Sequence, residues 1–238
     1  MPIYRLPNEF FFPPIEEAEP SGLLAIGGGL EPQRLILAYS QGIFPWYSEG
    51  QPILWFSPDP RFVLFPEEFH MSRSLKKRIK KRDFVVTLDQ DFSSIIQHCS
   101  QIPRPGQSGT WITEDMIDAY KTLHKLGIAH SVEVYQEETL VGGLYGLCLG
   151  NMYFGESMFA LVPDASKVGF SYLVQQMKVW GIELIDSQVH TTHLERFGAR
   201  HISRKLYMEK VQELIIKPRV RKKWQFDPDF FPLSTSKN

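Results

Sequence analysis

Two short segments near the middle of the chain alternate apolar residues with residues that carry ionisable or amide groups. The first covers 152–159 and the second covers 182–188, and both read as strands in which every second side chain faces the same side. The side chains expected on the shared faces are Met152, Phe154, Glu156 and Met158 in the first strand, and Ile182, Leu184, Asp186 and Gln188 in the second. A carboxylate among apolar neighbours is partly desolvated, which is costly unless it is paired or protonated.

Such a carboxylate has two explanations. It can be a structural group that backbone amides or an arginine satisfy, which is the better interpretation for a single residue. Two strands that both carry one, joined by a helix, favour a functional site, because perturbed ionisable groups cluster where chemistry occurs.

The same periodicities predict the rest of the fold. Strands are expected over 61–65, 84–88, 130–135, 140–149, 152–159 and 182–188, and helices over 72–82, 89–99, 113–127, 164–180 and 206–214, with a short helix near Leu194. Strands in a meander, followed by a helix and a further strand, predict an α+β fold with a mixed β-sheet.

The first 60 residues are expected to form a small N-terminal domain. Residues 1–20 read as an extended arm, 21–30 as a tight turn with three glycines, and 32–42 as a helix that begins with a proline. Four prolines between residues 45 and 60 prevent long regular elements there. We place the boundary at 57–60, which gives domains at 1–60 and 61–238.

The composition narrows the class of protein. The 238 residues include 26 basic and 27 acidic side chains, so no global charge selects a partner. Cys99 and Cys148 form no CxxC motif, and without a secretion signal they predict reduced thiols in a cytoplasm. No apolar run approaches ~18 residues, so no membrane-spanning helix is predicted. We expect a soluble cytoplasmic monomer with no membrane partner.

One predicted helix is strongly basic. Residues 72–82 hold a run of cations without a single acid: Arg73, Lys76, Lys77, Arg78, Lys80, Lys81 and Arg82. Ser72 is the expected cap, and Leu75 and Ile79 form one narrow apolar seam. Most charge runs are simply solvated, but a patch this concentrated attracts phosphate backbones, and the seam is too narrow for membrane insertion. We interpret the helix as a nucleic-acid-binding surface.

The aromatic residues of the proline-rich segment have two interpretations. Trp46, Trp55 and Phe56 can fill the core, or they can form rigid platforms on which bases stack. The sequence leaves both open.

Several familiar active sites are missing from the sequence. His190 and His193 lack a matched third ligand, so we assign no metal. Ser157 lacks the second glycine of a GxSxG elbow, and the glycines at 27–29 match neither phosphate-loop pattern. What remains is a non-covalent acid/base or orienting site made from Glu156, Asp186 and Gln188, with no cofactor.

A set of short motifs occurs in order between about Gly22 and Gly198. They are Gly42-Ile-Phe-Pro-Trp46, Leu54-Trp55 followed by Ser57-Pro-Asp-Pro-Arg61, Ser72-Arg-Ser74, Gly109-Thr-Trp-Ile-Thr113, Val141-Gly-Gly143, Gly155-Glu-Ser-Met-Phe159, Ala165-Ser-Lys167, and Leu184-Ile-Asp186 with Gln188. Together they resemble the leucyl/phenylalanyl-tRNA–protein transferase family, and as a set they are highly specific.

The resemblance implies a GNAT-like acyltransferase domain with a mixed sheet, preceded by a small N-terminal domain. It implies transfer of Leu or Phe, in some members Met, from aminoacyl-tRNA to the N-terminal Arg or Lys of a protein, which marks that protein for N-degron proteolysis in bacteria. The aminoacyl ester is already activated, so this reaction requires no ATP, metal or nucleotide loop.

The resemblance also implies roles for individual residues. Gln188, held by Asp186, positions the attacking α-amine or helps to deprotonate it, and Glu156 contacts the aminoacyl end as a base or as an anchor for an ammonium group. Trp46 and Trp111 match positions that hold the terminal adenosine of tRNA. Leu144, Met158, Phe170, Leu173 and Ile185 match the apolar side-chain pocket, Tyr120 is a further substrate-binding residue, and the basic helix matches the tRNA-binding surface.

Two other functions fit part of the pattern. A tRNA-dependent transferase with a different acceptor would share the fold but would not need an acidic pocket for Arg or Lys. A non-catalytic RNA-binding module would use the basic helix and the tryptophans, and it would keep its function when Glu156 and Asp186 are replaced by alanine. Some family members carry Met and Phe at Leu144 and Leu173, so the preference between Leu and Phe also stays open.

Overall fold

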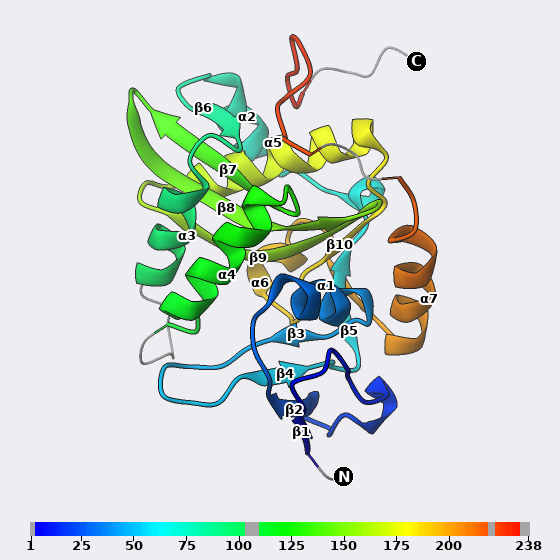
Figure 1. Ribbon diagram of the computed structural model, residues 1–238. Helices are drawn as coiled ribbons and strands as arrows, with labels where there is room; N and C mark the ends of the chain where they lie inside the picture. Colours follow the sequence, from blue (N-terminus) through cyan, green and yellow to red (C-terminus); the bar gives the residue numbers. More distant parts are fainter. Residues whose placement is uncertain (1–2, 103–109, 219–221, 234–238) are drawn as a thin grey trace.

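Two β-sheets and seven α-helices make up the part of the chain that the computed structural model describes, residues 3–102, 110–218 and 222–233 (Figure 1). The smaller sheet has the strand order β1-β2-β4-β3, and its strands are β1 (Tyr4–Leu6), β2 (Leu23–Gly27), β3 (Phe44–Pro45) and β4 (Leu54–Phe56). The strands of the larger sheet are β5 (Arg61–Leu64), β6 (Val85–Leu88), β7 (Ala129–Gln136), β8 (Thr139–Leu149), β9 (Met152–Ala160), β10 (Leu184–Asp186) and β11 (Arg200–Ile202). Their order is β11-β5-β10-β9-β8-β7-β6.

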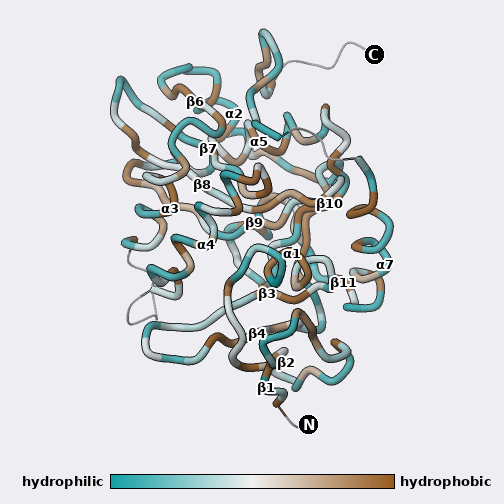
Figure 2. The backbone as a smooth tube through the Cα atoms, viewed as in Figure 1, coloured by the Kyte–Doolittle hydropathy of each residue, from teal (hydrophilic) through white to brown (hydrophobic). Residues whose placement is uncertain are grey.

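Helices cover both faces of the larger sheet. They are α1 (Pro32–Ser40), α2 (Arg73–Lys80), α3 (Phe92–Gln101), α4 (Glu114–Lys125), α5 (Ala165–Trp180), α6 (Thr192–Glu195) and α7 (Arg204–Leu214). In Figure 1, α3 and α4 lie on one face and α5 lies on the other. Ile95 and Met116 accordingly belong to the same buried cluster as Phe154, whereas Leu173 is buried in a second cluster with Leu144. Figure 2 shows the hydrophobic residues along β10 and the hydrophilic ones at the turn between β7 and β8.

The smaller sheet shares a core with the larger one. Leu24 of β2 and Leu35 of α1 belong to the cluster that contains Tyr145 of β8 and Phe154 of β9. The hydrophobic core is therefore continuous across residue 60, and the division into 1–60 and 61–238 stays a prediction.

The strands β9 and β10 run parallel and then separate. Leu184 lies opposite Met152 and Asp186 opposite Phe154, after which β10 ends while β9 continues to Ala160. The helix α5 connects the two strands, as parallel pairing requires. The gap that opens beyond Phe154 and Asp186 is the place where a ligand can enter the sheet.

The structure confirms the α+β class, the mixed sheet and most of the expected elements. The caps are confirmed as well, since Ser72 and Thr113 accept from the backbone amides of Leu75 and Met116, and Gly181 ends α5 in the left-handed region. Of the motif at 109–113, Gly109 lies outside the described residues.

Five strands were not predicted: the four strands of the smaller sheet, β1 to β4, and β11 of the larger sheet. Of these, β1, β3 and β4 lie in segments that we interpreted as an extended arm or as too rich in proline for long regular elements. The segment 21–30, interpreted as a tight turn, holds β2, and β11 lies where no element was expected. Both are short strands whose partners lie far away in the chain: β2 pairs with β1 and β4, and β11 pairs with β5. Local periodicity cannot reveal such pairing, because only the distant partner strand stabilises it.

The second functional strand is shorter than its sequence pattern indicates. We expected Ile182 and Gln188 to share its face with Leu184 and Asp186. The strand covers only Leu184–Asp186, Ile182 packs in the cluster on the α5 side, and Gln188 adopts a left-handed backbone with φ of 56°.

Within the described residues, none of the helices is long and apolar enough to cross a membrane.

We predict that Gly146→Ala destabilises the fold whereas Gly155→Ala does not. A methyl group on Gly146 would lie 2.1 Å from the carbonyl oxygen of Phe154 and 2.6 Å from the phenol of Tyr153, but on Gly155 its nearest neighbours are 3.7 Å away. The first change should lower the free energy of unfolding by about 1–3 kcal/mol. In thermal denaturation this corresponds to a Tm lower by roughly 2–4 °C per kcal/mol. Equal Tm values for the two variants would contradict the packing of Tyr153 on Gly146.

Candidate active site

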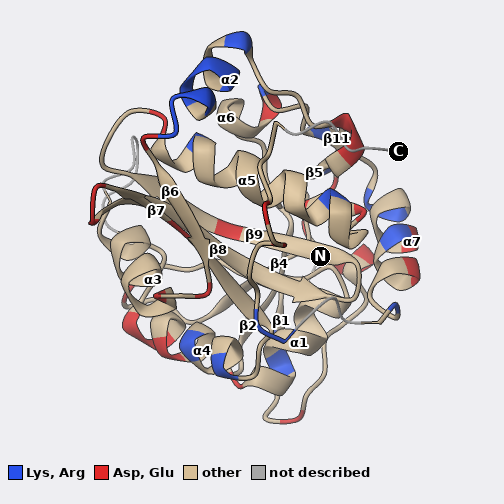
Figure 3. Cartoon of the chain, turned by 90° about the horizontal axis from the view of Figure 1, so that it is seen from above, with Lys and Arg blue, Asp and Glu red and all other residues tan. Residues whose placement is uncertain are grey.

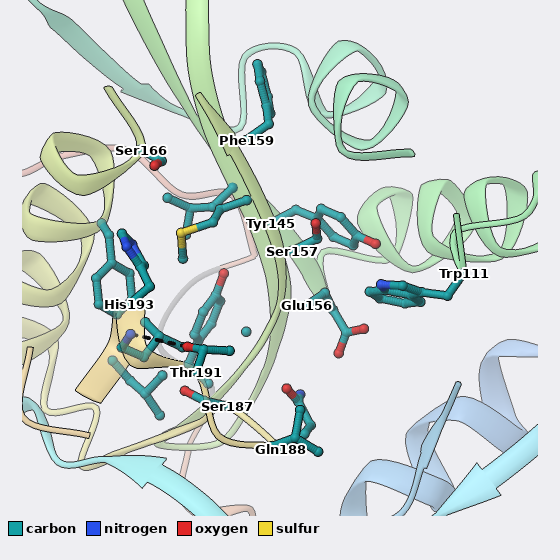
Figure 4. A pocket seen from close by; sticks show the side chains of 18 of the residues that line it. Trp111, Tyr145, Glu156, Ser157, Phe159, Ser166, Ser187, Gln188, Thr191 and His193 are labelled. Atoms are coloured by element: carbon teal, nitrogen blue, oxygen red, sulfur yellow. Dashed lines mark hydrogen bonds between the residues drawn. The ribbon is translucent and has the colours of Figure 1, made fainter. Parts of the chain in front are cut away.

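A cavity of about 500 Å³ lies where β9 and β10 separate (Figure 4). Its walls come from both sheets, from α5 and from the segment around α6. The predicted site residues that line it are Trp46, Trp111, Leu144, Glu156, Met158, Phe170, Ile185 and Gln188. Three further predicted residues, Tyr120, Leu173 and Asp186, are fully buried and do not line it.

Glu156 occupies an irregular position in β9. Tyr145 of β8 pairs with Ser157 and Gly146 pairs with Gly155, so Glu156 has no partner and forms a β-bulge. A bulge inserts one residue and shifts the alternation of side chains beyond it. Glu156 therefore keeps the face of Phe154, but Met158, which we expected on that face, packs with the cluster on the α5 side. The expectation for Met158 was wrong because the bulge lies between the two residues.

Two buried tyrosines hold the Glu156 carboxyl. The Tyr39 hydroxyl donates to Oε1 at 2.7 Å and the Tyr120 hydroxyl donates to Oε2 at 3.2 Å, and the two hydroxyls lie 2.5 Å apart. Desolvation raises the pKa of Glu156 from 4.5 to about 7, although the two tyrosine hydrogen bonds oppose the shift. The nearby charge of Asp186 raises this pKa further and that of Arg61 lowers it. Glu156 is thus a carboxyl that can take up and release a proton near neutral pH.

Asp186 is in the opposite situation. Arg61 of β5 donates to it twice, from Nε to Oδ1 at 2.9 Å and from Nη2 to Oδ2 at 2.7 Å. The Tyr207 hydroxyl donates to Oδ2 at 2.8 Å and the backbone amide of Gln188 donates to Oδ1 at 2.9 Å. Both oxygens of Asp186 are therefore hydrogen-bonded, and the residue has no exposed surface. Of the two explanations that the sequence left for a buried carboxylate, Asp186 fits the structural one, in which an arginine satisfies the charge.

Gln188 is placed at the cavity by its backbone. The bond from its amide to Asp186 fixes the residue in the left-handed conformation, and its side chain lines the cavity while only 9% of the residue is exposed. Its Nε2 has no hydrogen-bond partner among the described residues. A buried amide without a partner is costly, and a ligand in the cavity would satisfy it. In Figure 4 the Glu156 carboxyl is drawn between Trp111 and Gln188.

The tryptophans separate into two kinds. Trp46, which follows β3, and Trp111, which precedes α4, both line the cavity. Trp55 is fully buried and its indole nitrogen donates to the carbonyl oxygen of Gly27 at 2.8 Å, so it belongs to the core. Phe56 is half-buried and packs edge-to-face on Trp46.

Apolar side chains form the other wall of the cavity. Leu144, Met158, Phe170 and Ile185 line it from β8, β9, α5 and β10. Leu173, which we expected among them, is fully buried in α5, one turn beyond Phe170.

Sequence reasoning missed several residues of the site. Tyr39 donates a hydrogen bond to the Glu156 carboxyl, and Arg61 and Tyr207 donate to the Asp186 carboxylate. Tyr153 and His193 line the cavity. Arg61 is the last residue of the Ser57-Pro-Asp-Pro-Arg61 motif and the first residue of an apolar strand. A cation that is buried in such a strand needs a buried anion as its partner. The position of Arg61 in the sequence could therefore have indicated a pairing with a buried carboxylate. Nothing in the sequence pattern indicated the tyrosines.

The basic helix α2 has the predicted arrangement of its side chains. Leu75 and Ile79 are buried, while Arg73, Lys76, Lys77 and Lys80 are exposed, as are the following Lys81 and Arg82. Arg78 is partly engaged, because it pairs with Asp83 and covers the ring of Phe84. Figure 3 shows these cations grouped at one end of the molecule.

In the described part of the chain, no cluster of three or more His, Cys, Asp or Glu side chains is arranged to hold a metal ion.

The mixed sheet, the parallel strands that separate and the cavity between them define an α+β protein with a ligand-sized cavity in the sheet. Comparison with known proteins specifies the family. A model described as leucyl/phenylalanyl-tRNA protein transferase matches residues 63–212, and one for the N-terminal domain of the same family matches residues 28–59. The chain belongs to the leucyl/phenylalanyl-tRNA–protein transferase family.

Two relatives and one solved structure illustrate the similarity. The leucyl/phenylalanyl-tRNA–protein transferase of Myxococcus xanthus is 54% identical over 94% of this chain and 97% of its own length. That of Stutzerimonas stutzeri is 57% identical over 85% of this chain and 90% of its own length. A GCN5-related N-acetyltransferase from Kribbella flavida aligns with 8% identity and a TM-score of 0.36 over 72% of this chain and 61% of that chain, which is too distant to bear on function.

We predict a pH-dependent effect of Glu156→Gln on stability. The folded pKa of about 7 exceeds the unfolded value of 4.5, so between these pH values the folded protein binds more protons and Glu156 makes folding less favourable as the pH rises. Glutamine does not titrate. Relative to the parent protein, the variant should gain about 1.4 kcal/mol in free energy of unfolding per pH unit across this range. Urea denaturation at pH 4.5, 6 and 8 measures it, and a difference that does not change with pH would contradict the raised pKa.

We predict that Arg61→Leu costs about 3–5 kcal/mol of stability, because it leaves the buried charge of Asp186 without its cation. Replacing both residues, Arg61→Leu with Asp186→Leu, should cost less than the single change, because no buried charge remains. Urea denaturation of the three proteins gives the comparison. A double variant less stable than the Arg61 variant would show that the pair itself, rather than the orphaned charge, dominates.

Proposed function

We propose that the protein transfers leucine or phenylalanine from aminoacyl-tRNA to the N-terminal Arg or Lys of acceptor proteins, which marks them for N-degron proteolysis. The carrying observation is Glu156, a carboxyl with a pKa of about 7 at the wall of a cavity that also has an apolar side and two tryptophans. The family supports an aminoacyl-tRNA donor and a protein acceptor. Because aminoacyl-tRNA is used in the cytoplasm, we place the reaction there.

The donor would occupy the cavity in two parts. The side chain of the transferred amino acid contacts the apolar wall, which consists of Leu144, Met158, Phe170 and Ile185. This contact is favourable because it removes an apolar group from water. The terminal adenosine lies between the tryptophans at 46 and 111, which offer flat faces for stacking. Trp46 belongs to the proposed N-terminal domain and Trp111 to the proposed larger domain, so both domains would contribute to one site.

The chemistry is aminolysis of an ester. The α-ammonium group of the acceptor, with a pKa of about 7.7–8.0, must lose a proton before its nitrogen can attack. Glu156 as carboxylate accepts this proton, and its pKa near 7 makes the transfer possible at neutral pH. The new C–N bond forms, and the bond between the acyl carbon and the ribose oxygen breaks. The attacking nitrogen loses its second proton as it becomes an amide, and the ribose oxygen takes up that proton.

Gln188 and Asp186 have different roles in this proposal. The Nε2 of Gln188, which has no partner among the described residues, donates to the ester carbonyl oxygen as negative charge develops on it. Asp186 is a positioning residue, because its hydrogen bond to the Gln188 amide sets the backbone that carries this side chain. Glu156 is the one carboxyl among the described lining residues, so it would also meet the positive charge of an acceptor Arg or Lys.

The basic helix α2 would hold the body of the tRNA. Its exposed cations lie at one end of the molecule, away from the smaller sheet (Figure 3), and their attraction for phosphates does not depend on sequence. The tRNA-binding assignment of this helix is part of the same proposal.

The proposal is tested with purified protein, radiolabelled Leu-tRNA and two matched peptides that begin with Arg or with Asp. We expect label only on the Arg peptide, and none after treatment with RNase. Label on the Asp peptide would overturn the acceptor assignment, and binding of tRNA without any transfer would favour the RNA-binding module.

We predict that Gln188→Ala lowers kcat by roughly 10²-fold, the usual effect of removing a donor to a developing oxyanion. The affinity of the variant for Leu-tRNA should change little, because the Gln188 side chain interacts mainly with the charge that develops on the carbonyl oxygen during the reaction. Single-turnover transfer and equilibrium binding measure the two quantities, and Ser187→Ala, at the neighbouring lining residue, is the matched control. An equal loss of both quantities would assign Gln188 to binding.

A further inference from the structure

A line of polar and cationic side chains leads from the cavity to α2. His193 lines the cavity, Arg196 follows α6, His70 follows the short helix at Pro66–Glu68, and Arg73 begins α2. Arg196, His70 and Arg73 are exposed. We call these four residues the connecting strip. The active-site chemistry uses none of them, and of the four only Arg73 belongs to the patch on α2.

Packed side chains hold the two halves of the connecting strip together. The ring of His193 meets that of Phe197 edge-to-face with centroids 5.3 Å apart, and Phe197 stacks on Phe69, also at 5.3 Å. The backbone amide of His70 donates to the carbonyl oxygen of Phe197 at 2.9 Å. The segment that leads into α2 therefore lies directly against the segment that forms the cavity mouth.

The positive charge of Arg196 affects the pKa of His193, a residue that lines the cavity. The pKa of His193 is lowered first by burial and then by the positive charges of Lys167 and Arg196. A lowered pKa keeps His193 neutral at neutral pH, so its ring can donate one hydrogen bond to an anionic oxygen. Its Nε2 has no partner among the described residues.

Three acids near the connecting strip form ion pairs with a lysine or an arginine. The pairs are Glu67 with Lys178 at 2.9 Å, Glu68 with Arg200 at 2.9 Å, and Asp164 with Lys167 at 2.7 Å. Glu195 lies 3.3 Å from His190, a contact that is an ion pair only when the histidine is protonated. Arg73 and Arg196 have no ion-pair partner within the described part of the chain. Their charges remain available to an anion that approaches from solvent.

We propose that the connecting strip binds backbone phosphates of the single-stranded 3′ end of the aminoacyl-tRNA, between the terminal adenosine in the cavity and the tRNA body at α2. This rests on the proposed function. A cavity of about 500 Å³ accommodates a ligand of drug size, so the nucleotides that precede the terminal one must leave through its mouth. Each carries one negative charge past Arg196 and towards Arg73.

The test compares two donors. One is full-length Leu-tRNA and the other is the 3′-leucyl ester of adenosine, which has no phosphate. The variants are Arg196→Gln, Arg73→Gln and their combination. Lys205→Gln is the matched control, because it removes one exposed positive charge from α7, away from the connecting strip. Arg196→Lys keeps the charge and should restore most of the effect.

We expect each Gln variant to raise the KM for Leu-tRNA and to leave kcat and KM for the adenosine ester unchanged. In equilibrium binding of tRNA, the slope of log K against log salt should become shallower by about 0.7 for each lost phosphate contact. Between 50 and 200 mM salt this removes about a 2.6-fold change in affinity. Lys205→Gln should keep the parent slope.

Two results would overturn the proposal. One is an unchanged salt slope in Arg196→Gln, since Arg196 lies outside the patch on α2, and the other is an equal loss with both donors, which would place Arg196 in the pocket itself. Because the slope is measured by binding without turnover, it reports on the connecting strip even when transfer fails. Absence of transfer from both donors by the parent protein would instead count against the proposed function.

Discussion

The site depends on the buried pair of Arg61 and Asp186. Arg61 also donates to the carbonyl oxygen of Gly42 and lies over the rings of Phe44 and Tyr207, so one guanidinium joins the end of β10 to the smaller sheet and to α7. A buried ion pair often adds little net stability, because desolvation offsets the attraction. What this pair does determine is geometry: it fixes where β10 ends and, through the Asp186 carboxylate, where the chain turns at Gln188.

Two backbone irregularities then bring the polar groups to the cavity. The bulge at Glu156 turns one carboxyl towards Tyr39 and Tyr120, and the left-handed backbone at Gln188 directs an amide to the same cavity. Both follow the last residues at which β9 and β10 pair. The two carboxyls consequently have different environments, since Asp186 is paired with an arginine whereas the hydrogen bonds to Glu156 come from two neutral hydroxyls. Such a difference separates a positioning group from one that exchanges protons.

The sequence predicted what periodicity and local chemistry determine. The meander β7–β9, the amphipathic α5, the caps at Ser72 and Thr113 and the buried seam of α2 are confirmed. Alternation failed at Met158, because a bulge leaves no signal in a run of alternating residues. It also failed for β2 and β11, whose stability comes from distant partners. Arg61 was raised only as an unnamed arginine, since which cation reaches Asp186 depends on the pairing of β5 with β10.

Recognition of a tRNA by this protein has to combine two length scales. In the proposed function, a cavity of about 500 Å³ takes up one nucleoside and its amino acid, while the rest of the tRNA lies outside it. With a net charge of −1, the molecule as a whole does not attract a polyanion. Attraction must therefore come from where the cations lie. The helix α2 concentrates them, and Glu67 and Glu68, which precede it, are paired with Lys178 and Arg200. The orientation of the RNA would follow from this arrangement, because a strand anchored at both ends can lie only in one direction between them.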